Sequence, residues 1–271
     1  MQQSMTSAID LAIMLGIGSF AGIIIGLVGA SGAVVIISLL YLLLGFSIHE
    51  SIGTTLLASF IASSVVSSVY YKNKNIDFQP CLWLILGAIP GSQIGALLAF
   101  KTPEAQLRGL FGIVLIFMSI YLWRKGFDRE EVVKRFGAIF NVKSRNLKLI
   151  IGVTIGLWVG VIASILGATG GIWFFVILLL VFGLPLHKAV GGAAFLMALT
   201  ALSATFAHAM YGNVDLISGL VVGIGAAISG NLSAKFANAS TEDILMKTIA
   251  VLLAVLGIFM ISLEFLGISL H

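Results

Sequence analysis

Two long uncharged runs dominate the pattern of hydrophobic and polar positions along the chain. The first covers residues 11–48 and the second covers residues 149–186, and each holds 38 residues without an Asp, Glu, Lys, Arg or His. One bilayer crossing needs about 20 residues, so each run is too long for a single crossing. Each run therefore predicts a helical hairpin with arms of about 17 residues, or roughly 25 Å at the helical rise.

A short Gly-rich break interrupts each run once, at residues 29–32 and at residues 167–171. Glycine adopts backbone conformations that other residues avoid, and helix ends at a break expose N–H groups with a partial positive charge. Such ends bind anions without a Lys or Arg side chain. The alternative is that small residues here only allow helices to pack closely. The predicted substrate-binding residues of the breaks are Gly29, Ala30, Ser31, Gly32, Gly167, Ala168, Thr169, Gly170 and Gly171, with Ser31 and Thr169 as matched hydroxyl donors.

Three further apolar segments follow the first run. They cover residues 51–71, residues 78–100 and a segment that ends at Trp123. A shift of 138 residues lays the second half on the first without a gap from Gly22 to Ala99. Spaced polar and glycine matches at one fixed offset indicate an internal repeat. The matched pairs include Gly22/Gly160, Gly29/Gly167, Gly32/Gly170, Gly45/Gly183, His49/His187, Gly53/Gly191, Asn75/Asn213, Asp77/Asp215, Gly87/Gly225 and Gln93/Asn231.

Composition assigns the chain to the membrane. Its residues are 59% apolar and 10% charged, whereas a soluble domain carries about 25% charged residues. We predict an all-α polytopic membrane protein with two repeats of inverted topology, residues 1–123 and 149–271. Each repeat is a Gly-broken helical hairpin plus three transmembrane helices.

The linker at residues 124–148 predicts the orientation. It holds eight of the fifteen Lys and Arg residues, so the positive-inside rule places it in the cytoplasm. A hairpin returns to its starting side and three crossings change sides. Both termini are therefore expected outside the cytoplasm.

Matched polar residues outside the breaks are further candidates. His49 and His187 each follow a hairpin, where the imidazole either couples transport to protons or caps a helix at the interface. Gln93 and Asn231 are expected at equivalent buried positions, where an amide needs a partner in a neighbouring helix or in the substrate. His208 is expected near a helix end, with its side chain reaching the interface. The segment 51–71 also carries a hydroxyl face that either lines a polar path or hydrogen-bonds to other helices, formed by Thr54, Thr55, Ser59, Ser63, Ser64 and Ser67.

Several kinds of chemistry are absent from the sequence. It contains no phosphate-binding Gly-rich loop with Lys and Ser or Thr, no zinc-binding His-Glu-x-x-His helix, and no acidic pair within an apolar segment. We therefore expect no enzyme activity, no metal site and no cofactor. The expected partners are a small anion and the lipid bilayer, without nucleic acid. Coupling to protons or another ion, and a homo-oligomeric state, stay open.

The breaks and the segments after them resemble the TauE/SafE family of sulfite and organosulfonate exporters. The resemblance rests on residues 26–40, 51–60, 70–78 and 86–99, and on residues 164–171, 184–195 and 209–216. It covers nearly the whole chain. It implies a bacterial inner-membrane transporter of small sulfur-containing anions such as sulfite, sulfoacetate, other sulfonates or thiosulfate.

The resulting hypothesis is a secondary transporter, expected to be an exporter, that works by alternating access. The alternatives are an anion channel that uses the same site and a non-catalytic membrane subunit of a larger complex.

Overall fold

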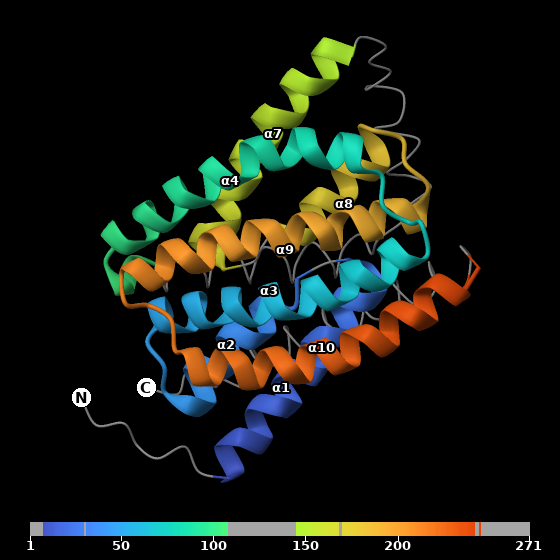
Figure 1. Ribbon diagram of the computed structural model, residues 1–271. Helices are drawn as coiled ribbons and strands as arrows, with labels where there is room; N and C mark the ends of the chain where they lie inside the picture. The colour runs from blue at the N-terminus through green and yellow to red at the C-terminus, as the bar shows by residue number, and fades with distance from the viewer. Residues whose placement is uncertain (1–7, 30, 108–144, 168–169, 242–243, 245–271) are drawn as a thin grey trace, which may run out of the picture.

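The computed structural model describes residues 8–29, 31–107, 145–167, 170–241 and 244. Its helices within those ranges are α1 (Ala8–Val28), α2 (Ala33–Leu44), α3 (Ile48–Lys72), α4 (Phe78–Lys101), α7 (Arg145–Leu166), α8 (Gly171–Leu180), α9 (Leu186–Met210) and α10 (Leu216–Ala239) (Figure 1). The predicted segment that ends at Trp123 and most of the 124–148 linker lie outside the described residues.

Six of these helices, α1, α3, α4, α7, α9 and α10, are long and apolar enough to cross a membrane. The predicted all-α, multi-pass membrane architecture is confirmed. The prediction of equal hairpin arms is wrong, because α1 and α7 have 21 and 22 residues whereas α2 and α8 have 12 and 10. Helix α2 ends directly before Gly45 and α8 ends three residues before Gly183, and these glycines have φ angles of 68° and 66°. Glycine in this left-handed conformation terminates a helix.

Helices of the two halves alternate in the packing. Figure 1 shows α4, α9, α3 and α10 side by side in that order, and α7 packs along α4 while α1 packs along α10. Glycines allow this close approach. A Cβ atom on Gly22 of α1 would meet the Ala226 carbonyl of α10, and one on Gly160 of α7 would meet the Ala88 carbonyl of α4. These two contacts are the same contact made twice, at the 138-residue offset.

Polar contacts repeat in the same way. The Tyr70 hydroxyl donates to the Gly26 carbonyl oxygen at 3.0 Å, and His208, its equivalent, donates from Nε2 to the Ser164 carbonyl oxygen at 3.2 Å. The prediction that His208 reaches the interface is therefore wrong. Its side chain is fully buried. Burial of Nε2 is tolerated because a carbonyl oxygen of the neighbouring helix α7 accepts its hydrogen bond.

Candidate functional site

Both Gly-rich breaks turn on glycines with positive φ angles. Gly29 has φ +65° in the first break, and Gly167 and Gly170 have φ +64° and +68° in the second. A residue with a side chain is disfavoured at a positive φ angle, so the backbone conformation of the breaks requires glycine at these positions. Ser31 lies directly before Gly32, the N-cap residue of α2, and its Oγ accepts a hydrogen bond from the Ala33 N–H at 3.1 Å. Three predicted site residues, Ala30, Ala168 and Thr169, lie outside the described residues.

The structure brings the two breaks together. A Cβ atom on Gly171 would lie 2.7 Å from the Gly29 carbonyl oxygen and 2.9 Å from the Ser31 amide nitrogen. Gly171 is also the first residue of α8, whose first N–H groups have no acceptor within the helix. The positive end of α8 therefore begins against the backbone of the first break. The role of these residues in binding a substrate stays a prediction.

Helices α9 and α3 flank the breaks in equivalent ways. A Cβ atom on Gly29 would lie 2.9 Å from the Val190 carbonyl oxygen of α9, and one on Gly167 would lie 3.2 Å from Cγ2 of Ile52 in α3. The Met197 sulfur of α9 also contacts the Gly171 position. Sequence reasoning missed Val190, Ile52 and Met197, because apolar side chains carry no chemical signal. The available clue was that Ile52 and Val190 each follow one of the matched histidines by three residues, which places them at equivalent positions of the repeat.

Some hydroxyls on the predicted face of α3 have a hydrogen-bond partner and others have none in the described part of the chain. Ser64 and Ser67 donate to the carbonyl oxygens of Phe60 and Ser64 within their own helix, at 2.7 and 3.2 Å. Thr54 accepts a hydrogen bond from the Asp215 N–H at 3.0 Å, which is a contact to the turn before α10. The remaining hydroxyls, of Thr55, Ser59 and Ser63, are buried and have no hydrogen-bond partner in the described part of the chain.

The matched histidines make matched contacts. His49 donates from Nε2 toward the carbonyl oxygens of Ala99 and Thr102, both at 3.2 Å. His187 does the same toward Ala237 and Ser240, at 3.1 and 3.2 Å. These carbonyls end helices α4 and α10, where an imidazole satisfies groups that the helix leaves open. The contacts agree with the capping alternative, and the coupling role stays a prediction.

The amide pair is not equivalent in the structure. Gln93 lies on an exposed face of α4 and donates from Nε2 to the Ser203 carbonyl oxygen of α9 at 2.8 Å. The expectation of a buried Gln93 is therefore wrong, since a hydrogen bond along the surface of α9 satisfies its amide. Asn231 is half-buried, and its Oδ1 has no partner among the described residues.

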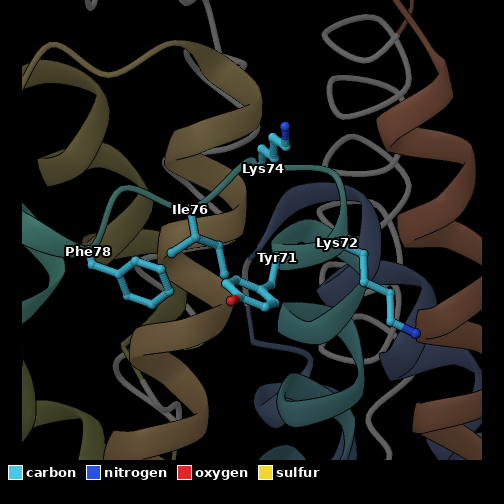
Figure 2. Close-up of a pocket in the computed structure, with 5 residues that line it drawn as sticks. All are labelled: Tyr71, Lys72, Lys74, Ile76 and Phe78. Carbon is cyan, nitrogen blue, oxygen red and sulfur yellow. The ribbon is translucent and has the colours of Figure 1, made fainter.

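A cavity of about 410 Å³ lies at the connection between α3 and α4 (Figure 2). It is lined by Tyr71, Lys72, Lys74, Ile76 and Phe78, none of which is a predicted site residue. The rings of Tyr71 and Phe78 meet edge to face at 5.9 Å. Figure 2 shows the ammonium groups of both lysines directed away from the apolar side chains. This cavity lacks donors that converge on an anion.

Comparison with known proteins identifies the family. The sequence profile described as sulfite exporter TauE/SafE matches residues 14–260. The chain belongs to the TauE/SafE family. No solved structure matches it.

The chain is similar to several probable membrane transporter proteins. A probable membrane transporter protein, YunE of Bacillus subtilis (strain 168), is 24% identical over 262 residues, which cover 92% of this chain and 96% of that protein. Two others from the same organism, the probable membrane transporter proteins YdhB and YjnA, are 26% and 27% identical and cover 89% and 86% of this chain. The match spans 96% and 94% of those two proteins. This TauE/SafE chain is thus a membrane transporter by family.

Proposed function

We propose that the protein is a secondary transporter that exports small sulfur-containing anions, such as sulfite, sulfoacetate, other sulfonates or thiosulfate, across the bacterial inner membrane. The observation that carries this proposal is the meeting of Gly171 with Gly29 and Ser31. It joins one break from each half of the chain at the positive end of α8. Backbone dipoles at such a point attract an anion without a fixed cation, so the anion can also leave.

The reciprocal contacts of the two halves support alternating access. Gly22 contacts Ala226 and Gly160 contacts Ala88, so each half packs against the other through the same pair of equivalent positions. In transporters built from inverted repeats, one repeat rocks against the other around a central site. The inverted orientation, the cytoplasmic 124–148 linker and the outer location of both termini are part of this proposal.

Uptake into proteoliposomes tests the proposal. Purified protein in proteoliposomes should accumulate radiolabelled sulfite or thiosulfate above the external concentration when a proton or other ion gradient is imposed. Equilibration without accumulation would instead identify an anion channel. Protein that binds and moves none of these anions alone would contradict the proposal and favour the subunit alternative.

A further inference from the structure

One face of α3 carries a row of buried hydroxyls at every fourth residue. They belong to Ser51, Thr55, Ser59 and Ser63, and each of these side chains is 0% exposed. None of their oxygens has a hydrogen-bond partner in the part of the chain that the structure describes. A spacing of four places all of them along one side of the helix.

The unpartnered state is not a general property of hydroxyls in α3. Ser64 and Ser68, on the other side of the same helix, donate to the carbonyl oxygens of Phe60 and Val65, both at 2.7 Å. Buried polar groups in proteins are nearly always hydrogen-bonded, so four unpartnered donors in one row require an explanation. A ligand that carries acceptor oxygens supplies one.

The row lies on the side of α3 that faces the breaks. Ile52, which contacts the Gly167 position at 3.2 Å, precedes Thr55 by three residues and Ser59 by seven, so all three share a face. The repeat makes Ser59 the equivalent of Met197, whose sulfur contacts the Gly171 position. The equivalents of the whole row in α9 are apolar and fully buried: Ala189, Ala193, Met197 and Ala201.

We propose that the anion site has two chemically different sides. Thr55 and Ser59 of α3 donate hydrogen bonds to the oxygens of the anion, and Ala193 and Met197 of α9 form an apolar, polarisable side. Such a site selects an anion with oxygens at one end and a sulfur or alkyl group at the other. It disfavours a symmetric oxyanion, because the oxygen placed against Met197 loses its hydrogen bonds to water without replacement. This inference rests on the proposed function.

Thiosulfate and sulfate form a matched pair of probes, since they share charge and shape and differ by one terminal sulfur. Isothermal titration of the purified full chain should give tighter binding of thiosulfate than of sulfate. In Ser59→Ala, thiosulfate binding should weaken by about tenfold or more, because a hydrogen bond to a charged group is lost. Thr55→Val, which keeps the side-chain volume, should weaken it in the same direction. Ser64→Ala is the matched control and should bind as the wild type does.

Met197→Ser tests the other side of the site. It adds a donor to the apolar side, so the preference for thiosulfate over sulfate should fall by about tenfold. Unchanged thiosulfate affinity in both Ser59→Ala and Thr55→Val, with unaltered melting temperatures, would overturn the two-sided site. Unchanged selectivity in Met197→Ser would also overturn it. If the wild type binds no anion at all, the proposed function itself fails, which distinguishes the two outcomes.

Discussion

At the residue scale, the breaks depend on glycines that no other residue replaces without strain. Gly29 combines a φ of +65° with a carbonyl oxygen of Val190 at 2.9 Å from the position of a Cβ atom. Gly16, also in α1, has open space within 4 Å of that position. Alanine substitutions at Gly29 and Gly16 therefore separate the effect on stability of a glycine in the break from that of an ordinary helical glycine.

We expect Gly29→Ala to lower the free energy of unfolding by at least about 1–2 kcal/mol, the cost of a left-handed alanine. Gly16→Ala should be neutral or stabilising by up to about 1 kcal/mol, since alanine favours the helix. Melting temperatures of the purified variants in detergent measure both effects. Equal melting temperatures for the two variants would contradict this account of the first break.

The two histidines lead to a second prediction at this scale. His49→Ala removes the donor that meets the carbonyl oxygens of Ala99 and Thr102. It should lower the free energy of unfolding by about 1 kcal/mol, and His187→Ala should do the same at the end of α10. Transport by both variants should keep the wild-type dependence on an imposed pH gradient. Loss of that dependence in either variant would instead support a coupling role.

At the element scale, the spanning helices and the breaks could be predicted because uncharged runs and glycine clusters are local signals. The arm lengths could not, although Gly45 and Gly183 were already matched in the repeat. Only the structure shows that their φ angles end the short helices. The burial of His208 and the exposure of Gln93 also depend on neighbours distant in sequence, namely Ser164 and Ser203.

Close packing between α4 and α7 gives a prediction for a pair of elements. A Cβ atom on Gly91 would lie 3.0 Å from the Leu157 carbonyl carbon, so the two helices must separate to admit it. Gly91→Ala should lower the free energy of unfolding by about 1–3 kcal/mol, as overpacking does in other cores. Its melting temperature, compared with that of Gly16→Ala, measures this. If Gly91→Ala is as stable as Gly16→Ala, the close approach of α4 and α7 does not depend on the absence of a side chain at Gly91.

At the scale of the whole molecule, the repeat explains why two short helices begin at one place. Each half supplies a broken hairpin, and contacts such as Gly22 with Ala226 and Gly160 with Ala88 tie each half to the other. The sequence predicted the repeat from glycine and polar matches. It also predicted a hydroxyl face on residues 51–71, but not which of those hydroxyls are buried without a hydrogen-bond partner, because that depends on neighbours in the folded chain.

Orientation is a separate prediction for the whole molecule. A green fluorescent protein inserted near residue 130 should fluoresce, because the basic linker is expected in the cytoplasm. Alkaline phosphatase fused after residue 271 should be active, because the C-terminus is expected outside. A non-fluorescent linker together with inactive phosphatase at the C-terminus would reverse the orientation. A fluorescent linker together with inactive phosphatase would contradict the count of crossings.

The central claim is that the two breaks together hold the anion. Thiosulfate titration of Gly171→Ala tests it most directly, since the added methyl group would lie 2.7 Å from the Gly29 carbonyl oxygen and 2.9 Å from the Ser31 nitrogen and would force the two breaks apart. The account predicts thiosulfate affinity at least about tenfold weaker than in the wild type, with Gly16→Ala unchanged. Wild-type affinity in a folded Gly171→Ala protein would contradict it.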